Sequence, residues 1–353
     1  MKRFGIIGTG MIAQFHAKAI EAIDGACLLS CYNPNPQKSA DFAAKFGIKS
    51  YHDLDTFLAD PDLDIVTIGT PSGAHLEPAI AAMNAGKHVI CEKPLEITPQ
   101  RIDSMMEAAE RNQVVLAAIL NRRFNEAVTQ LKQAVDHGRF GKLSLVEASI
   151  KWFRSQQYYD SAAWRGTWVL DGGGALMNQS IHIIDQLIHI VGPVKRVCGS
   201  MACIAHQGIE VEDTAVAILE FANGARGVIQ GSTACYSSTG HPAEVDICGD
   251  RGSAFMTDES FDVWDFVDEH PNDVHVRKNL MKQSASGLGA NDPGAINFSG
   301  HQRNFEEVMD AIEHGLQPST HAAEARKAVA LICAIYESAR NGGKWIDLSN
   351  SHS

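Results

Sequence analysis

Two glycines and an alanine that directly follow a short apolar run are the feature that most narrows the possible folds of this chain. The run Phe4–Ile7 predicts a buried strand, and the residues up to about Ile23 follow a helical pattern. Between them stands the pattern Gly8-x-Gly10-x-x-Ala13. In a strand–turn–helix unit the first glycine forms the tight turn, the second lets a pyrophosphate approach, and the third small residue allows close packing. The chain therefore begins with a predicted dinucleotide-binding unit.

About the first 120 residues alternate short apolar runs with helical stretches, which predicts a parallel sheet with crossover helices. The expected strands are Phe4–Gly8, Cys27–Tyr32, Ile65–Gly69, His88–Cys91 and Val114–Ala118. The expected helices are Ile12–Ile23, Pro36–Phe46, Asp53–Ala59, His75–Ala85 and Pro99–Arg111. Ligands of such sheets bind beyond the carboxyl ends of the strands, so the loops after these strands are where chemistry is expected.

The alternation stops after a helix expected at Asn125–His137, and the second part of the chain has a different pattern. Short runs of alternating apolar and polar residues fill the region 194–267, and Asn223-Gly224 between two of them is a strong hairpin signal. The other expected elements are a strand at Val146–Trp152, a long helix at Leu176–Val191, a loop over the site at Lys282–Ser299, and closing helices at His301–His314 and His321–Asn341. The pattern predicts a mainly antiparallel sheet that packs one face on helices and offers the other to a partner subunit.

The composition limits the partners and the location of the protein. The 353 residues suffice for two domains, and a net charge of −12 without a basic stripe argues against nucleic acid or an anionic membrane as partner. An anionic substrate would need a local arginine cluster, for which Arg122-Arg123 and Arg165 are the candidates. The eight cysteines form no CxxC pair, and no apolar segment reaches the roughly 18 residues of a membrane span. We expect a cytoplasmic protein without a metal site.

Two motifs contain residues that could carry chemistry. Glu92-Lys93-Pro94 follows the strand His88–Cys91, where a lysine could bind a substrate hydroxyl and lower its pKa; the alternative is a surface lysine in a turn. Asn178, His182 and Asp185 share the spacing of one helical face after three glycines. His182 is a candidate general base that Asp185 could orient; the alternative is a hydrogen-bonded helix histidine.

The chain resembles the Gfo/Idh/MocA oxidoreductase family over nearly its whole length. The motifs that carry the resemblance are Gly8-Thr9-Gly10-Met11-Ile12-Ala13, Thr70-Pro71-Ser72-Gly73-Ala74-His75, Glu92-Lys93-Pro94, and Gly172-Gly173-Gly174 through His182 and Asp185. The resemblance implies a fold of the α/β class, with an N-terminal doubly wound Rossmann sheet and a C-terminal α+β domain with a large open sheet that mediates oligomerisation. It further implies that Lys93 polarises the substrate oxygen, that His182 is the acid/base, and that Pro94 follows a cis peptide bond.

Two positions depart from the family pattern. Many members have an aspartate where this chain has Asn178, and an amide cannot accept a proton, so the base role falls on His182 alone. Asn33 stands where an aspartate commonly binds the ribose of NAD, and Lys38 lies within reach of that position. NAD is the expected cofactor, and NADP stays open.

The predicted function is hydride transfer between nicotinamide and a secondary ring alcohol of a sugar, sugar derivative or cyclitol. Two alternatives stay open at this point. One is a redox-neutral, NAD-dependent enzyme that cleaves glycosides by oxidation, elimination and reduction. The other is a sugar and NAD sensor without activity, against which the presence of both Lys93 and His182 argues.

The expected domains are a dinucleotide-binding domain at 1–122 and a substrate-binding and oligomerisation domain at 123–353, in a homodimer or homotetramer. The residues expected to bind the cofactor are Gly8, Thr9, Gly10, Met11, Ile12, Asn33, Lys38, Thr70, Pro71, His75, Glu92 and Lys93. Those expected to bind the substrate are Lys93, Arg123, Trp164, Arg165, Asn178, His182 and His301, with Asp185 behind His182. Tyr158, Tyr159 and Trp168 are further candidates for stacking on a sugar, or for simple packing.

Overall fold

The structure, a computed structural model, describes residues 1–282 and 298–349. The chain forms two compact units, one of Met1–Asn121 and Asn297–Arg326 and the other of Arg122–Ile296 and Lys327–Ser353. The first unit thus includes a stretch from the region that the sequence analysis assigned to the second domain. The functional boundaries 1–122 and 123–353 stay a prediction, and most of the expected loop Lys282–Ser299 lies outside the described residues.

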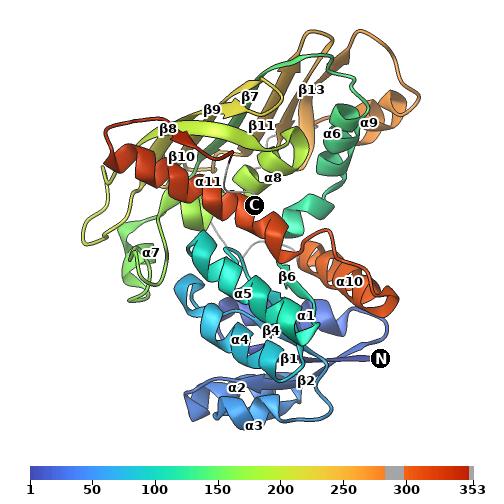
Figure 1. The fold of residues 1–353 in the computed structure, drawn as a ribbon, viewed down its shortest axis with the longest axis vertical. Helices are drawn as coiled ribbons and strands as arrows, with labels where there is room; N and C mark the ends of the chain where they lie inside the picture. The colour runs from blue at the N-terminus through green and yellow to red at the C-terminus, as the bar shows by residue number, and fades with distance from the viewer. Residues whose placement is uncertain (283–297, 350–353) are drawn as a thin grey trace. The chain divides into compact units, whose positions relative to one another are not determined.

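The first unit contains a six-stranded parallel sheet in the order β3-β2-β1-β4-β5-β6 (Figure 1). Its strands are β1 (Lys2–Ile7), β2 (Ala26–Tyr32), β3 (Lys49–Tyr51), β4 (Ile65–Ile68), β5 (His88–Cys91) and β6 (Leu116–Ala118). Its crossover helices are α1 (Met11–Glu21), α2 (Pro36–Phe46), α3 (Leu54–Leu58), α4 (Leu76–Asn84) and α5 (Pro99–Asn112). This order is that of a dinucleotide-binding sheet, so the predicted Rossmann architecture is confirmed. The sequence pattern did not predict β3, because this strand is short and largely exposed and has no apolar run.

Local signals in the sequence define the ends of these helices. The side chain of Asn35 caps α2 by accepting a hydrogen bond from the backbone of Lys38, and Gly47 ends that helix at φ +66°. Thr98 caps α5 in the same way. In the described part of the chain, no helix combines the length and the apolar character needed to cross a membrane.

One further helix of the first unit comes from far along the chain. Helix α10 (Ser299–His314) packs beside α1 (Figure 1). It adds Phe305 and Val308, both fully buried, to the hydrophobic core of this unit. The rings of Phe305 and Phe4 lie 5.8 Å apart between centroids. This contact brings the residues around 301 close to the carboxyl end of the parallel sheet.

The second unit is built on an eight-stranded sheet in the order β13-β12-β11-β7-β10-β9-β8-β14. Its strands are β7 (Leu143–Lys151), β8 (Val194–Ala202), β9 (Thr214–Phe221), β10 (Arg226–Ser232), β11 (Ala243–Gly249), β12 (Gly252–Thr257), β13 (Ser260–Phe266) and β14 (Ile346–Asp347). Its helices are α6 (Glu126–Asp136), α7 (Gln156–Asp160), α8 (Ile181–Val191) and α9 (Asp273–Asn279), and α11 (Ala322–Arg340) packs on β8. Among the strands that the structure describes in this sheet, β7 and β10 form the one parallel pair. The mainly antiparallel sheet and the hairpin at Asn223-Gly224 are therefore confirmed.

The helix expected at Leu176–Val191 divides into two parts. Residues Ala175–Ser180 form a π-helix, and α8 begins at Ile181. Asn178 therefore lies on the π-helix and His182 in the first turn of α8, and the expectation that both side chains share one face stays a prediction. Single π-turns are common at functional sites.

The buried carboxylate of Glu212 fastens the start of this π-helix. One of its oxygens accepts hydrogen bonds from the backbone of Leu176 and from the hydroxyl of Tyr336, both at 2.8 Å, and the other accepts one from the backbone of Gly174 at 2.9 Å. A side chain at position 174 would collide with the backbone oxygen of Glu212, so only glycine fits there. Burial raises the pKa of Glu212 to about 7, because the loss of hydration outweighs these hydrogen bonds.

The raised pKa of Glu212 predicts a pH dependence of stability. Between its ordinary value of 4.5 and about 7, the folded protein keeps a proton that the unfolded chain has released. The stabilising contribution is therefore complete below the lower value and is lost as the pH rises to 7, which amounts to about 3 kcal/mol. Because Glu212→Gln cannot titrate, we expect its free energy of unfolding to rise relative to wild type by this amount from pH 4.5 to 8. Urea denaturation measures it, and a difference that stays constant with pH contradicts the prediction.

Candidate functional site

The loop after β1 has the shape of a phosphate-binding turn. Gly8 has φ +90°, and a Cβ there would lie 2.8 Å from the backbone oxygen of Gly69, so this turn requires glycine. At Gly10, by contrast, a Cβ would meet no atom within 4 Å. No side chain caps α1 in the described part of the chain, whereas Asn35, Asp53 and Thr98 cap α2, α3 and α5. The amides at the start of α1 are thus left for a ligand, and the open space at Gly10 fits the pyrophosphate of a dinucleotide.

The other residues predicted to bind the cofactor surround this turn. The side chain of Asn33, just after β2, donates to the hydroxyl of Thr9 at 2.8 Å and accepts from the backbone of Asn35 at 2.9 Å. This arrangement ties the end of β2 to the phosphate turn. Met11 is 52% exposed at the start of α1, and the side chain of Ile12 lies against Gly69. Lys38 lies in the exposed first turn of α2.

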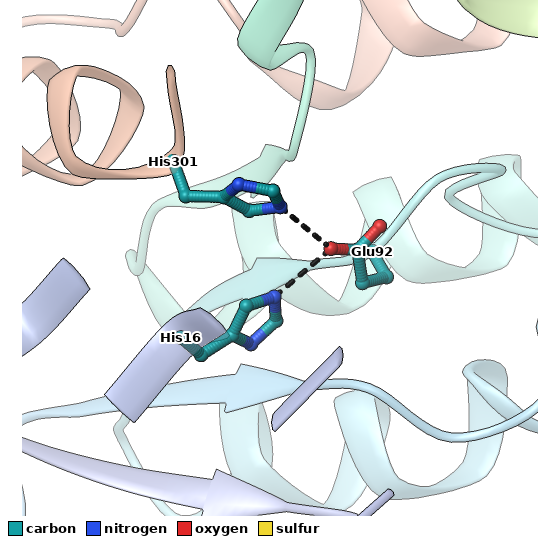
Figure 2. A group of neighbouring side chains, drawn as sticks. All are labelled: His16, Glu92 and His301. Carbon is teal, nitrogen blue, oxygen red and sulfur yellow. Dashed lines mark hydrogen bonds and ion pairs between the residues drawn. The ribbon is translucent and has the colours of Figure 1, made fainter. Parts of the chain in front are cut away.

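A buried carboxylate and two histidines lie at the carboxyl end of β5. The Oε1 atom of Glu92 is 2.9 Å from Nε2 of His16, which α1 carries, and 3.4 Å from Nε2 of His301, which α10 carries (Figure 2). All three side chains are more than nine-tenths buried. The hydroxyl of Thr67 lies 2.9 Å from Nδ1 of His16, and the amide of Asn121 lies 3.4 Å from Nδ1 of His301. With these groups donating to Nδ1, each histidine donates from Nε2 to Glu92.

The hydrogen bonds of this cluster set the charge of its carboxylate. Burial by itself would raise the pKa of Glu92, but the hydrogen bonds from His16 and His301 hold it well below its usual value. Burial lowers the pKa of His16, which keeps that ring neutral near pH 7. Two histidines and a glutamate are residue types that can bind a metal ion, and their ligand atoms lie within 4.8 Å of one another. The hydrogen bonds between them nevertheless account for their placement. The cluster therefore holds one ionised carboxylate between two imidazole rings, of which that of His16 is neutral.

Lys93 follows this carboxylate directly. The second oxygen of Glu92 accepts a hydrogen bond of 3.0 Å from the backbone nitrogen of Lys93. The Lys93–Pro94 peptide bond is cis, which confirms the expectation from the family resemblance. His301, predicted to bind substrate, is occupied with Glu92 in this structure, and its substrate role stays a prediction.

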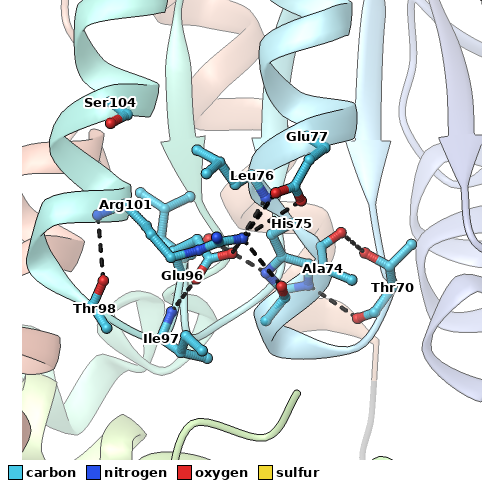
Figure 3. A network of polar contacts seen from close by, with 12 residues as sticks. Thr70, Ala74, His75, Leu76, Glu77, Glu96, Ile97, Thr98, Arg101 and Ser104 are labelled. Atoms are coloured by element: carbon cyan, nitrogen blue, oxygen red, sulfur yellow. Dashed lines mark hydrogen bonds and ion pairs between the residues drawn. The ribbon is translucent and has the colours of Figure 1, made fainter. Parts of the chain in front are cut away.

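His75 braces the loops that follow β4 and β5. Its Nε2 lies 3.0 Å from the backbone oxygen of Thr70 (Figure 3). Its Nδ1 lies 3.0 Å from the backbone oxygen of Pro94. The ring is 1% exposed. The hydroxyl of Thr70 donates to the backbone oxygen of Ala74, which closes the turn that Pro71 begins. His75 thus shapes the loop, and direct contact with the cofactor stays a prediction.

An arginine that the sequence analysis did not select joins the same two loops. Arg101 in α5 donates to the carboxylate of Glu96 at 2.9 Å and to the backbone oxygen of Gly73 at 3.2 Å (Figure 3). Glu96 is fully buried, so this pair links the loop after β4 to the loop after β5. The missed residues, among them His16, Thr67, Glu96 and Arg101, belong to no local motif, because their partners lie far away in sequence.

In the second unit, Asn178 belongs to a hydrogen-bonded group on the π-helix. Its amide donates to the carboxylate of Asp171, and its oxygen accepts a bond of 3.1 Å from Gln179. His182 lies in the first turn of α8 and is partly buried. Asn178 and His182 both lie near the N-terminal end of α8, and both belong to the second unit.

Asp185 and Arg123 form a buried ion pair in the same unit. The Nε and Nη2 atoms of Arg123 donate to the two carboxylate oxygens at 2.8 and 2.6 Å, and both side chains are 4% exposed. This fork geometry gives Asp185 a structural partner. Roles of Asp185 in orienting His182 and of Arg123 in binding substrate stay predictions.

Two of the aromatic residues considered for stacking on a sugar make packing contacts, and two others stack on an arginine. The hydroxyl of Tyr159 hydrogen-bonds that of Thr233 at 2.8 Å in the core, and Trp168 packs edge-on against Tyr336. These two contacts are packing contacts. The guanidinium of Arg165 instead lies over the rings of both Tyr158 and Trp164.

Replacing Gly10 with valine tests the phosphate turn. The new side chain meets no protein atom near its Cβ, so the fold should persist, but it fills the space that a pyrophosphate needs. We expect NADH to bind at least about tenfold more weakly, or about 1.4 kcal/mol, in a fluorescence titration. The exposed Ala44→Val in α2 is the matched control, and wild-type affinity in Gly10→Val would contradict the prediction.

Comparison with known protein families agrees with both units. Residues 2–119 match the model described as "Oxidoreductase family, NAD-binding Rossmann fold". Residues 128–255 match the model described as "GFO/IDH/MocA C-terminal domain". The two matches lie on the parallel sheet and on the mainly antiparallel sheet.

Individual relatives point to the same family. The myo-inositol 2-dehydrogenase of Thermotoga maritima is 31% identical over 72% of this chain and 74% of its own length. The levoglucosan dehydrogenase of Pseudarthrobacter phenanthrenivorans is 26% identical over 98% of this chain and 97% of its own. Among solved structures, the WlbA dehydrogenase of Bordetella pertussis in complex with NADH and UDP-GlcNAcA has a TM-score of 0.88 at 34% identity, covering 98% of this chain and 97% of that one. The chain belongs to the Gfo/Idh/MocA family of oxidoreductases, with an NAD-binding Rossmann fold.

Proposed function

We propose that this oxidoreductase transfers hydride between NAD and a secondary ring alcohol of a sugar, sugar derivative or cyclitol. The observation that carries the proposal is Lys93 on its cis turn, directly after an ionised and buried Glu92 at the carboxyl end of β5. Ligands of a doubly wound sheet bind at this edge. The inositol and levoglucosan dehydrogenases among the relatives support the substrate class.

The residues of the chain have distinct roles in this reaction. When bound, NAD supplies the nicotinamide ring that accepts the hydride. Lys93 donates a hydrogen bond to the substrate oxygen and stabilises the negative charge that develops there. His182 takes the hydroxyl proton, because an imidazole titrates near neutral pH. Asn178 binds a neighbouring hydroxyl, and it leaves the base role to His182 since an amide accepts no proton.

Glu92 supports Lys93 without contacting the substrate in this proposal. Its fixed negative charge lies next to the lysine in the sequence and holds the backbone of Lys93 through the 3.0 Å hydrogen bond. The two histidines and His75 keep the turn in one conformation, and such fixed geometry lowers the cost of orienting the reactants.

Removing either proposed catalytic residue should abolish most of the activity. We expect Lys93→Ala and His182→Ala each to lower kcat/KM by about 10²–10⁴-fold, because each removes one proton-transfer or hydrogen-bonding group. The measurement is NADH formation from NAD with a panel of free sugars, glycosides, uronates, cyclitols and nucleotide sugars. The exposed Lys45→Ala in α2 serves as control. Wild-type rates in both variants, or no NADH from any substrate with the wild type, would contradict the proposal.

We propose further that the protein is a homo-oligomer formed through the open face of the second sheet. Along β9, buried residues alternate with exposed ones, and the exposed Val216 and Ile218 are 50% and 52% accessible. Leu145 on β7 is 53% accessible. Exposed apolar groups of this kind on a sheet face favour a second copy as partner.

A charged residue on this face tests the assembly. Ile218→Glu should shift the protein to the monomer in sedimentation-velocity experiments, since an unpaired carboxylate in an apolar interface is costly to bury. Lys278→Glu on the exposed side of α9 is the control. A wild-type protein that sediments as a monomer, or an unchanged assembly in Ile218→Glu, would speak against this interface.

The proposed location is the cytoplasm. All eight cysteines have free thiols in the structure. Cysteines without disulfides are typical of proteins that work in a reducing compartment.

A further inference from the structure

Arginines and aromatic rings alternate in one region of the second unit. We call this set the arginine ladder; its members are Arg122, Trp152, Arg154, Tyr158, Arg165 and Trp164. The Arg165 guanidinium lies 4.1 Å from the ring centre of Tyr158 and 4.8 Å from that of Trp164. Arg154 lies over both Trp152 and Tyr158, at 5.3 and 5.5 Å. The rings hold the guanidinium planes in place by cation–π contacts.

In the described part of the chain, part of the ladder's positive charge has no ion-pair partner, although Asp258 and Glu259 lie close enough to Arg122 to favour its charged form. Among the described residues, neither Arg122 nor Arg165 forms an ion pair, whereas the stacked Arg139 and Arg196 elsewhere in this unit pair with Asp273 and Glu220. Arg154 and Arg165 lie close enough to repel each other. In a protein with a net charge of −12, such a local excess of positive charge is unusual.

Two buried donors in the ladder lack acceptors. The Nε atom of Arg165 and the indole nitrogen of Trp152 are both buried, and neither has a hydrogen-bond partner among the described residues. Buried donors are nearly always satisfied in folded proteins, so these two unsatisfied donors, one of them on Arg165 itself, point to a missing acceptor. An oxyanion satisfies both requirements, because it supplies negative charge and several acceptor oxygens.

Hydrogen bonds connect the ladder to the residues proposed to act on the substrate. Gln179 accepts a bond from Arg154 at 2.9 Å and donates to the hydroxyl of Tyr158 at 3.0 Å. The same amide group donates to Asn178 at 3.1 Å, and α8 with His182 begins two residues after Gln179. The ladder and the π-helix thus form one polar network within the second unit.

We propose that the arginine ladder binds an oxyanion of the substrate, so that the protein acts on acidic sugars in preference to neutral ones. The inference rests on the proposed dehydrogenase function. Arg165 makes the direct contact through its planar fork, and Arg122 and Arg154 add to the positive potential. The oxyanion is a ring carboxylate, as in a uronate, or a phosphate, as in a sugar phosphate or nucleotide sugar.

Steady-state kinetics with matched sugars test this inference. The probes are glucose, glucuronate, glucose 6-phosphate, UDP-glucose and UDP-glucuronate, with NAD. We expect an acidic sugar to exceed glucose in kcat/KM by at least about tenfold, since charge-assisted hydrogen bonds to arginine are strong. A preference for glucuronate identifies a carboxylate as the anion, and a preference for glucose 6-phosphate or UDP-glucose identifies a phosphate.

Substitution of Arg165 separates recognition from packing. Arg165→Met keeps an apolar stem against Tyr158 and Trp164, and we expect it to raise KM for the acidic sugar at least about tenfold while kcat changes little. Arg165→Lys keeps the charge and should recover part of the affinity. Arg196→Met, which removes another stacked arginine of this unit, is the control. Equal kcat/KM for glucose and all acidic probes, or equal losses for both classes in Arg165→Met, would overturn the inference while leaving the dehydrogenase function intact.

A binding experiment decides the inference even if no probe is oxidised. Calorimetric titration of the His182→Ala variant with glucuronate and with glucose 6-phosphate, in the presence of NADH, measures recognition without turnover. Binding that Arg165→Met abolishes in this background supports the ladder as an anion site, even where the proposed function has failed. Absence of binding by both acids, or binding that Arg165→Met leaves unchanged, overturns it.

Discussion

The buried carboxylate of Glu92 holds together the proposed site at the carboxyl end of the parallel sheet. A negative charge in an apolar interior is stable only when donors surround it, and three elements far apart in the sequence provide them: α1, α10 and the turn that carries Lys93. The same charge thus connects the phosphate-binding helix, a helix from the C-terminal part of the chain, and the lysine proposed for catalysis. His75 and Arg101 then hold the adjoining loops to one another.

A second buried glutamate serves the second unit in a related way. Glu212 also accepts three hydrogen bonds, and it fastens the start of the π-helix that carries Asn178. The pKa values of the two carboxylates nevertheless shift in opposite directions. The imidazole donors keep the pKa of Glu92 well below its usual value, whereas burial prevails at Glu212 and raises its pKa to about 7. Each unit therefore holds its proposed site residues with a buried glutamate, and the two glutamates differ in whether hydrogen bonds or burial sets their pKa.

The proposed anion site depends on which arginines of the second unit already have an acidic partner. Arg123 is neutralised by Asp185 in a buried fork, while Arg122 and Arg165 stack on aromatic rings without forming ion pairs among the described residues. A potential of this kind acts only over a short distance at physiological ionic strength. It favours recognition of a bound substrate more than long-range attraction, which suits a small sugar-like molecule.

Periodicity and turn residues were enough to predict the parallel sheet, the tight turn after its first strand and the hairpin at Asn223-Gly224, because these depend on local patterns. The cis bond before Pro94 followed from the family resemblance. The sequence also selected Arg165 as part of a possible anion site. The sequence did not predict β3, the π-helix, the pairing of Glu92 with His16 and His301, or the bonds of Glu212 to the start of the π-helix. These features depend on the tertiary structure, because they arise where segments far apart in sequence pack together and where a buried charge must find its donors. Periodicity in a sequence reports the face that an element buries, whereas the partner across that face is set by the fold.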